Sequence, residues 1–236
     1  MEENVEPKVL PGEGAGAWAR KHRWVILYML LLLLVVPMRD LWAPDEPDFA
    51  QCVREMRERG SWLLPYLNGQ PYSEKPILFY WLMKASVLAG DWLSGGRGYS
   101  HGVAAWALRL PSVGASIVFL FAFRRWAARF LQEDVADLAL LVLCSSPLWF
   151  WQSQFIQIDL LFAALLAWAW LSWLGGYLLL RGLTAGAGRE APRWFLMAYT
   201  SLGLAFLAKG PLALVLSLLV LIPFLLWQRD LKALLQ

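Results

Sequence analysis

Residues 77–93, ILFYWLMKASVLAGDWL, decide how this chain is arranged in a membrane. The segment is apolar enough to enter a bilayer, but it is shorter than the roughly 20 residues that a spanning helix needs. Lys84 stands midway along it, and Gly90-Asp91 follow near its end. A charged side chain in the bilayer core is costly unless it meets a partner or a water-filled cavity. We therefore expect this helix to lie in the membrane interface or to re-enter it, without crossing.

The basic residues of the later loops support this expectation. Cytoplasmic loops of membrane proteins carry an excess of Lys and Arg. If residues 77–93 crossed, every later basic cluster would lie outside; if they do not cross, all of these clusters become cytoplasmic: Arg124-Arg125 and Arg129, then Arg181, Arg189 and Arg193, then Arg229 and Lys232. The sequence thus predicts six spans with both termini inside, at about 24–42, 103–124, 134–151, 159–180, 193–208 and 210–228. The third and fifth are short, so we expect them to be tilted or broken.

The composition sets the class of protein. With 59% hydrophobic residues, 15 Trp and only 17% charged residues, the chain is not an ordinary soluble domain. The net charge of +3 is small, and the basic residues do not form the stripe that marks nucleic-acid binding. Cys52 and Cys144 belong to no Cys/His spacing typical of a metal site. We interpret residues 1–23 as a cytoplasmic tail and residues 24–236 as one membrane-embedded unit.

The first external loop is predicted to hold two interfacial helices, of which residues 77–93 form the second. In the first, Pro47–Arg59, four apolar residues share one face at helical spacing: Phe49, Cys52, Val53 and Met56. Such a helix is amphipathic and suits the membrane surface. The predicted fold class is therefore an all-α integral membrane protein with about six transmembrane helices and two interfacial ones.

Under this topology, two acids and two lysines fall on the external face: Asp45, Lys75, Asp159 and Lys209. Pro47 and Pro76 disfavour helical dihedrals at the residues before them, so Glu46 and Lys75 are expected on extended backbone just before a helix. One interfacial charge alone would be interpreted as a side chain that snorkels to water. Four that converge indicate a site, because carboxylates can supply a general base or a metal ligand and lysines a point charge for phosphate.

Motifs along most of the chain resemble those of one membrane glycosyltransferase family. They are Asp45-Glu46, Phe49-Ala50, Arg54-Glu55-Met56, Gly60-Ser61-Trp62, Pro65, Leu67-Asn68-Gly69, Tyr72, Glu74-Lys75-Pro76, Tyr80-Trp81-Leu82, Arg109-Leu110-Pro111-Ser112, Asp159 and Ala208-Lys209-Gly210-Pro211. From Trp24 onward the chain is similar to the polyprenyl-phosphate-sugar-dependent enzymes of the C superfamily, which include lipid A aminoarabinose transferases and protein O-mannosyltransferases. Members are usually much longer, so the chain resembles their amino-terminal catalytic core, with the carboxy-terminal half absent.

The resemblance implies a role for each site residue. Asp45 would be the catalytic carboxylate, a general base toward the acceptor, and Asp159 a second acid. Lys75 and Lys209 would hold the donor phosphate, with Tyr72 and Glu74 orienting Lys75. Glu46 and Asp159 would support the base or, with Asp45, bind a divalent metal, the one cofactor that we consider.

The implied function is inverting transfer of a sugar from a polyprenyl-phosphate carrier to a lipid A-like lipid, a glycan or a protein. It would take place on the periplasmic face of a bacterial inner membrane, with no nucleic-acid partner and with a second chain as one source of the missing half. Two alternatives stay open. One is a transporter or flippase for a polyprenyl-linked sugar, and the other is a non-catalytic partner subunit.

Overall fold

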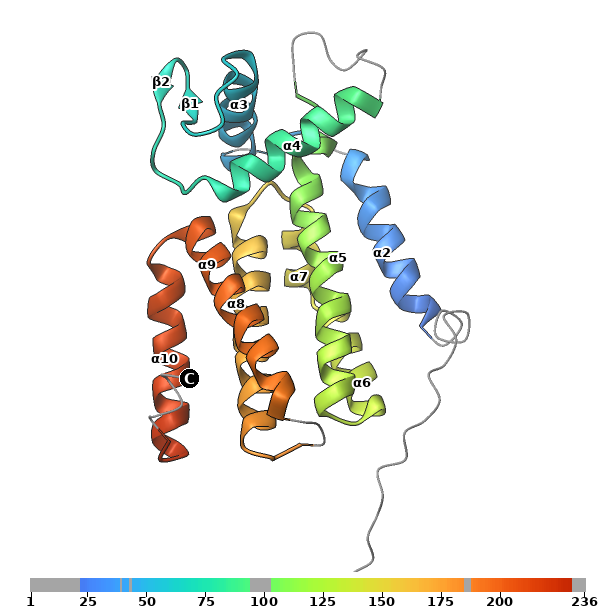
Figure 1. Cartoon of the computed structure of the whole chain (residues 1–236). Coiled ribbons are helices and arrows are strands. Elements are labelled where there is room, and N and C mark those ends of the chain that lie inside the picture. Colours follow the sequence, from blue (N-terminus) through green and yellow to red (C-terminus); the bar gives the residue numbers. More distant parts are fainter. Residues whose placement is uncertain (1–21, 39, 43, 94–102, 185–187, 231–236) are drawn as a thin grey trace, which may run out of the picture.

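The structure is a computed structural model that describes residues 22–38, 40–42, 44–93, 103–184 and 188–230 (Figure 1). The expected tail, residues 1–23, lies almost wholly outside the described residues. The elements follow in this order: α2 (Arg23–Val35), η1 (Val36–Met38), α3 (Asp45–Glu58), β1 (Tyr66–Leu67), β2 (Gln70–Pro71), α4 (Leu78–Leu93), α5 (Ala105–Phe130), α6 (Glu133–Ser145), α7 (Pro147–Ser153), α8 (Ile158–Leu180), η2 (Gly188–Glu190), α9 (Ala191–Lys209) and α10 (Leu212–Trp227).

The long helices form one bundle. Helix α8 packs between α5 and α9, α10 lies against α9, and α2 and the α6–α7 pair pack on α5 (Figure 1). Within the described residues, α5 and α8 are long and apolar enough to cross a membrane, and the α6–α7 pair is a third candidate if it is one bent span. Helices α2 and α10 are shorter apolar helices. Each of the six predicted spans thus coincides with a helix or a helix pair.

The third predicted span is broken, as its length suggested. Helices α6 and α7 meet at an angle of 65°. Ser146 between them is extended, because the ring of Pro147 disfavours helical dihedrals at the residue before it. The Ser146 side chain then accepts a hydrogen bond from the Trp149 backbone N–H, which starts α7. The fifth predicted span differs, because α9 is one continuous helix of 19 residues.

Helix α4 lies across one end of the bundle, whereas the long helices run along it (Figure 1). Its Lys84 is buried, and Nζ donates hydrogen bonds to the carbonyl oxygens of Met56 (3.0 Å) and Ser61 (2.7 Å). These carbonyls lie in and just beyond the last turn of α3, where a cation is favoured by the helix dipole. Lys84 therefore fastens α4 to the end of α3.

Helix α3 has the predicted amphipathic character, since Phe49, Cys52, Val53 and Met56 are all buried. They pack on Phe79, Tyr80 and Met83 of α4 and on Leu108 of α5 in one core under the site. Two details differ from expectation. The helix begins at Asp45, so Glu46 is helical despite Pro47, because the contacts of its carboxylate hold it there. Glu55, a charged residue outside the apolar set of this helix, is buried as well.

Glu55 holds a small hairpin that the all-α prediction missed. Strands β1 and β2 are antiparallel, with Leu67 opposite Gln70. Asn68 and Gly69 turn between them with φ of 53° and 81°, values typical of the Asn-Gly turn of a two-residue hairpin. The Gly69 N–H donates to both carboxylate oxygens of Glu55. The Asn-Gly pair was the sequence signal for this turn.

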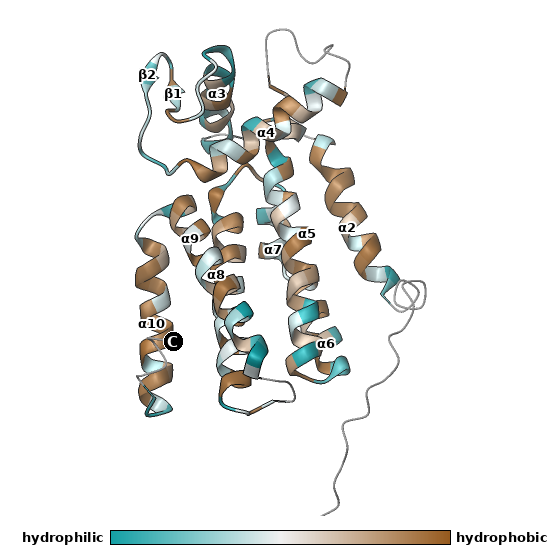
Figure 2. Ribbon diagram, in the orientation of Figure 1, coloured by the Kyte–Doolittle hydropathy of each residue, from teal (hydrophilic) through white to brown (hydrophobic). Residues whose placement is uncertain are grey.

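The opposite end of the bundle gathers the basic residues of the loops. Arg124 pairs with Glu133 (2.5 Å) and Asp137 (2.9 Å), and Arg129 pairs with Glu190 (2.5 Å). Figure 2 shows hydrophilic residues at this end and again on α3 and the hairpin, with hydrophobic helix between them. The molecule therefore has two polar ends separated by an apolar belt.

Candidate active site

Asp45 and Lys75 lie together at the end of the bundle that carries α3 and the hairpin. Lys75 Nζ is 3.9 Å from Asp45 Oδ1 and 4.3 Å from the centroid of the Phe49 ring. About half of the Asp45 side chain (52%) and a third of that of Lys75 (34%) are exposed, so both can meet a ligand. Asp45 stands in the first turn of α3, at the positive end of the helix dipole.

Asp159 and Lys209 form a second acid–lysine pair. Asp159 is in the first turn of α8 and Lys209 is the last residue of α9, and Lys209 Nζ donates to Asp159 Oδ1. Lys209 precedes Gly210, which has φ of 70° and ψ of −149° and separates α9 from α10. A side chain larger than hydrogen is strained at this φ, so Gly210 makes the sharp turn that leaves Lys209 at the end of α9.

The two pairs come near each other where the Lys75-Pro76 segment approaches the Lys209-Gly210-Pro211 segment. A Cβ placed on Gly210 would lie 4.0 Å from Cγ of Pro76, the residue after Lys75. Leu78, at the start of α4, packs on the cluster that contains Ala208 of α9 and Phe162 of α8. Segments far apart in sequence therefore bring Asp45, Lys75, Asp159 and Lys209 to one end of the bundle, as the sequence predicted.

Glu46 is placed differently, because it is buried and bound to Arg109, the largest of the fully buried side chains. Arg109 Nε and Nη2 donate to the two carboxylate oxygens at 3.1 and 2.7 Å. The backbone N–H groups of Trp42 and Ile156 donate to the same oxygens at 2.7 and 2.8 Å. Burial by itself would raise the pKa of Glu46, but these hydrogen bonds outweigh it and hold the pKa below its usual value.

Arg109 extends this buried centre to the end of the first helix. Its Nη1 donates to the Val36 carbonyl (3.1 Å) and its Nη2 to the Asp40 carbonyl (2.8 Å). The Glu46–Arg109 pair thus joins the segment after α2, the start of α3, α5 and the α7–α8 connection. This geometry favours a positioning role for Glu46. Sequence reasoning quoted Arg109 within a motif and assigned it no role, although an arginine inside an apolar run is itself a signal.

Tyr72 and Glu74 contact each other near Lys75. The Tyr72 hydroxyl donates to Glu74 Oε2 at 3.1 Å. Burial, and to a lesser extent the bond to this carboxylate, raises the pKa of Tyr72 to about 12. The Tyr72 backbone N–H donates to the Pro65 carbonyl at 2.9 Å, beside the hairpin. These hydrogen bonds therefore stabilise the segment between β2 and Lys75.

A divalent metal shared by Asp45, Glu46 and Asp159 does not fit this arrangement. The Glu46 oxygens already accept four hydrogen bonds, and Asp159 is paired with Lys209. In the part of the chain that the structure describes, no group of three or more His, Cys, Asp or Glu side chains is close enough to hold a metal ion.

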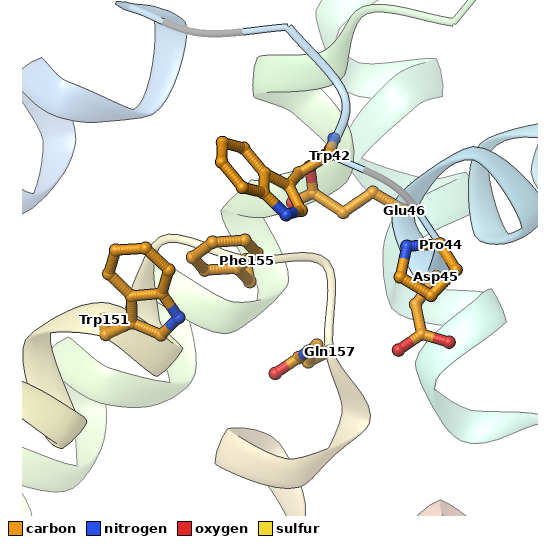
Figure 3. Close-up of a pocket in the computed structure, with 7 residues that line it drawn as sticks. All are labelled: Trp42, Pro44, Asp45, Glu46, Trp151, Phe155 and Gln157. Carbon is orange, nitrogen blue, oxygen red and sulfur yellow. Dashed lines mark hydrogen bonds between the residues drawn. The ribbon is translucent and has the colours of Figure 1, made fainter.

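A small pocket opens beside Asp45 (Figure 3). Its volume is about 180 Å³, and it is lined by Trp42, Pro44, Asp45, Glu46, Trp151, Phe155 and Gln157. In Figure 3 the rings of Trp42, Phe155 and Trp151 stand on one side, Asp45 on the other, and Gln157 between them. The sequence analysis assigned no role to the aromatic residues or to Gln157.

Comparisons with known proteins point to one family. Residues 74–236, more than half of the chain, match the family described as dolichyl-phosphate-mannose-protein mannosyltransferase. The chain is also similar to the undecaprenyl phosphate-alpha-4-amino-4-deoxy-L-arabinose arabinosyl transferase of Serratia proteamaculans, with 34% identity over 230 residues, which are 92% of this chain and 37% of the relative. The protein of the same name from Yersinia enterocolitica is 31% identical over 232 residues, 96% of this chain and 37% of the relative.

A solved structure has the same fold. The crystal structure of ArnT from Cupriavidus metallidurans bound to undecaprenyl phosphate superposes with a TM-score of 0.77 and 25% identity, over 92% of this chain and 37% of that chain. The chain thus spans little more than a third of the length of these relatives. The resemblance expected from the motifs is confirmed, as is the class of helical membrane protein. The chain belongs to the dolichyl-phosphate-mannose-protein mannosyltransferase family.

Proposed function

We propose that this chain carries the catalytic centre of a membrane glycosyltransferase that takes a sugar from a polyprenyl-phosphate carrier and passes it to a lipid acceptor. The observation that carries the proposal is the meeting of two acid–lysine pairs, Asp45–Lys75 and Asp159–Lys209, at one end of an apolar bundle. The relatives are named for an undecaprenyl-phosphate sugar donor, which needs a site of this kind. Cations at the membrane boundary can bind the phosphate while its hydrocarbon tail stays in the lipid.

The chemistry follows from where these groups stand. An acceptor hydroxyl attacks the anomeric carbon as Asp45 accepts its proton, and the bond from that carbon to the phosphate oxygen breaks with its electron pair on the phosphate. Negative charge therefore grows on the carrier phosphate, where Lys75 and Lys209 oppose it. Stabilisation of developing charge is usually the largest single catalytic contribution. Attack from the face opposite the leaving phosphate inverts the anomeric centre.

Asp159 is assigned as the partner that holds Lys209. Its carboxylate fixes Nζ at the boundary between α9 and α10, so the ammonium group is in place before the donor arrives. Positions prepared in this way avoid reorganisation during the reaction. We assign Glu46 the corresponding task for the start of α3, and hence for Asp45.

Removal of either lysine charge is expected to weaken donor binding and also to slow the chemical step. The contact with phosphate strengthens in the transition state, so both quantities fall in Lys75→Met and Lys209→Met. Donor binding and single-turnover transfer in proteoliposomes are the measurements. Arg54→Met is the control, since Arg54 is a half-exposed charge (45%) on the outer side of α3. A lysine variant that bound and transferred like the unaltered chain would remove that lysine from the phosphate site.

The proposal includes the membrane arrangement: six spans, α3 and α4 in the interface, and the active site on the periplasmic face of a bacterial inner membrane. It is supported by the crosswise position of α4 and by the basic residues at the far end of the bundle (Figure 1). The region of the relatives that this chain does not match is proposed to take part in acceptor recognition.

Single cysteines test this arrangement in a background where the buried Cys52 and Cys144 are replaced. A cysteine at Gln70, exposed on the hairpin, is expected to react with an impermeant thiol reagent in spheroplasts. Cysteines at Arg125 and Arg189, exposed at the other end, are expected to react only after permeabilisation. Reaction at Arg125 from outside would mean that α4 crosses the bilayer, and the six-span arrangement would be wrong.

A further inference from the structure

The pocket beside Asp45 is lined mostly by residues to which the two acid–lysine pairs give no role. Of its lining residues, only Asp45 belongs to those pairs, and neither lysine contributes. Its other side is aromatic, and Trp42 and Trp151 are 60% and 55% exposed. Large exposed aromatic faces beside a reactive carboxylate indicate a surface against which the ring of a ligand can pack.

This aromatic wall is held in place. Phe155 is buried, and its ring stacks on that of Trp151 with centroids 4.8 Å apart and planes inclined by 34°. The backbone N–H of Trp42 donates to Glu46 Oε2, and the backbone N–H of Ile156, next to Phe155, donates to Glu46 Oε1. The backbone on both sides of the aromatic wall is thus hydrogen-bonded to the carboxylate of Glu46, the residue after Asp45. The backbone that carries Trp42 and Phe155 is therefore held beside the start of α3, which carries Asp45.

Gln157 supplies the polar contact. It is the residue before the first turn of α8, and its side chain does not cap that helix. Figure 3 shows its amide between Trp151 and Asp45. An amide can donate and accept at the same time, which matches a hydroxyl group. At about 180 Å³ the pocket is smaller than the roughly 300–1,000 Å³ of sites for drug-sized ligands, so it suits a single ring.

We propose that this pocket is the subsite for one pyranose ring, packed on Trp151 and Trp42 and hydrogen-bonded by Gln157, and that it positions that ring against Asp45. A pyranose is amphipathic in the same way as the pocket: its C–H face packs on indole and its hydroxyls point to polar groups. The inference rests on the proposed function. The ring comes from one of two sources, the donor or the acceptor.

Tryptophans at this level also serve simply as membrane-interface anchors. An anchor needs neither Gln157 nor a fixed distance to Asp45, and it affects every lipid alike. Trp92, at the end of α4 and 80% exposed, lines no part of the pocket and provides the matched control.

The test measures binding of three lipids to the chain in nanodiscs: bare polyprenyl phosphate, the same lipid carrying a sugar, and lipid A. We expect Trp151→Ala to weaken one of the two sugar-bearing lipids by about 3- to 10-fold, which is the contribution of one ring contact, and to leave bare polyprenyl phosphate unchanged. Trp151→Phe should retain most of the affinity, Gln157→Ala should show the same lipid selectivity as Trp151→Ala, and Trp92→Ala should change none of the three. Loss confined to the glycosylated carrier assigns the subsite to the donor sugar, and loss confined to lipid A assigns it to the acceptor.

Two results would overturn the inference. Equal loss for all three lipids would make Trp151 an anchor, and no loss for either sugar-bearing lipid would leave the pocket without a sugar. In both cases, intact binding of bare polyprenyl phosphate by the unaltered chain would show that the phosphate site still stands. Failure of the unaltered chain to bind any of the lipids would instead contradict the proposed function, and the subsite with it.

Discussion

Asp45→Asn is expected to slow sugar transfer by about 10²–10⁴-fold while the lipid donor still binds. A positioned general base contributes roughly this factor. Asparagine keeps the size and polarity of the side chain but cannot take the proton of the acceptor hydroxyl. In the proposed mechanism the donor phosphate is held by Lys75 and Lys209, and the substitution removes neither lysine. The rate constant of a single turnover at saturating donor is the quantity to measure, in proteoliposomes that contain any second chain needed for activity.

The matched control is Asp48→Asn. Asp48 is exposed, stands in the same first turn of α3, and lines no part of the pocket. Both substitutions therefore remove one negative charge from the same helix end, and only Asp45→Asn removes the base. Near-normal transfer by Asp45→Asn would eliminate Asp45 as the base. A flippase would then be the better description, since movement of a polyprenyl-linked sugar needs the lysines and no proton acceptor.

Arg109→Leu is expected to destabilise the folded chain by about 3–5 kcal/mol, because it leaves the Glu46 carboxylate buried without its counter-ion. The Val36 and Asp40 carbonyls lose their donors in the same step. The segment after α2 and the start of α3 would then lose their link to α5, so transfer should fall together with stability. Unfolding by graded addition of a denaturing detergent, followed by intrinsic fluorescence, measures the change.

Arg125→Leu is the control for loss of an arginine from the same helix, since Arg125 is exposed on α5. The double variant Arg109→Met with Glu46→Met should recover only part of the loss. It removes the buried charge, but the N–H groups of Trp42 and Ile156 lose their acceptor. If Arg109→Leu were as stable as Arg125→Leu, the Glu46–Arg109 pair would not be what holds these segments together.

The same pair predicts how stability depends on pH. Because the pKa of Glu46 is lower in the folded chain than in the unfolded chain, its contribution is fully present above the unfolded value of about 4.3. It is lost as the pH falls through the lower, folded value. Glu46→Gln should therefore flatten the acid side of the stability profile.

The sequence by itself determined the class of the protein and the position of most of its elements. Long apolar runs can satisfy their backbone groups in lipid only as helices, so the long helices could be located from hydropathy. The amphipathic face of α3 was predictable because helical periodicity is a local property. The break between α6 and α7 was predictable in part, since the apolar run is too short for one straight span.

Only the tertiary structure decided which carboxylate could react. Asp45 and Glu46 are adjacent in sequence, yet one is about half exposed beside Lys75 and the other is buried against Arg109, 63 residues away. No local pattern separates them, because the difference comes from the packing of α5 and the α7–α8 connection against the start of α3. The pocket beside Asp45 is hidden from sequence for the same reason. Its walls come from residues 42–46 and 151–157, and their closeness exists only after the bundle has folded.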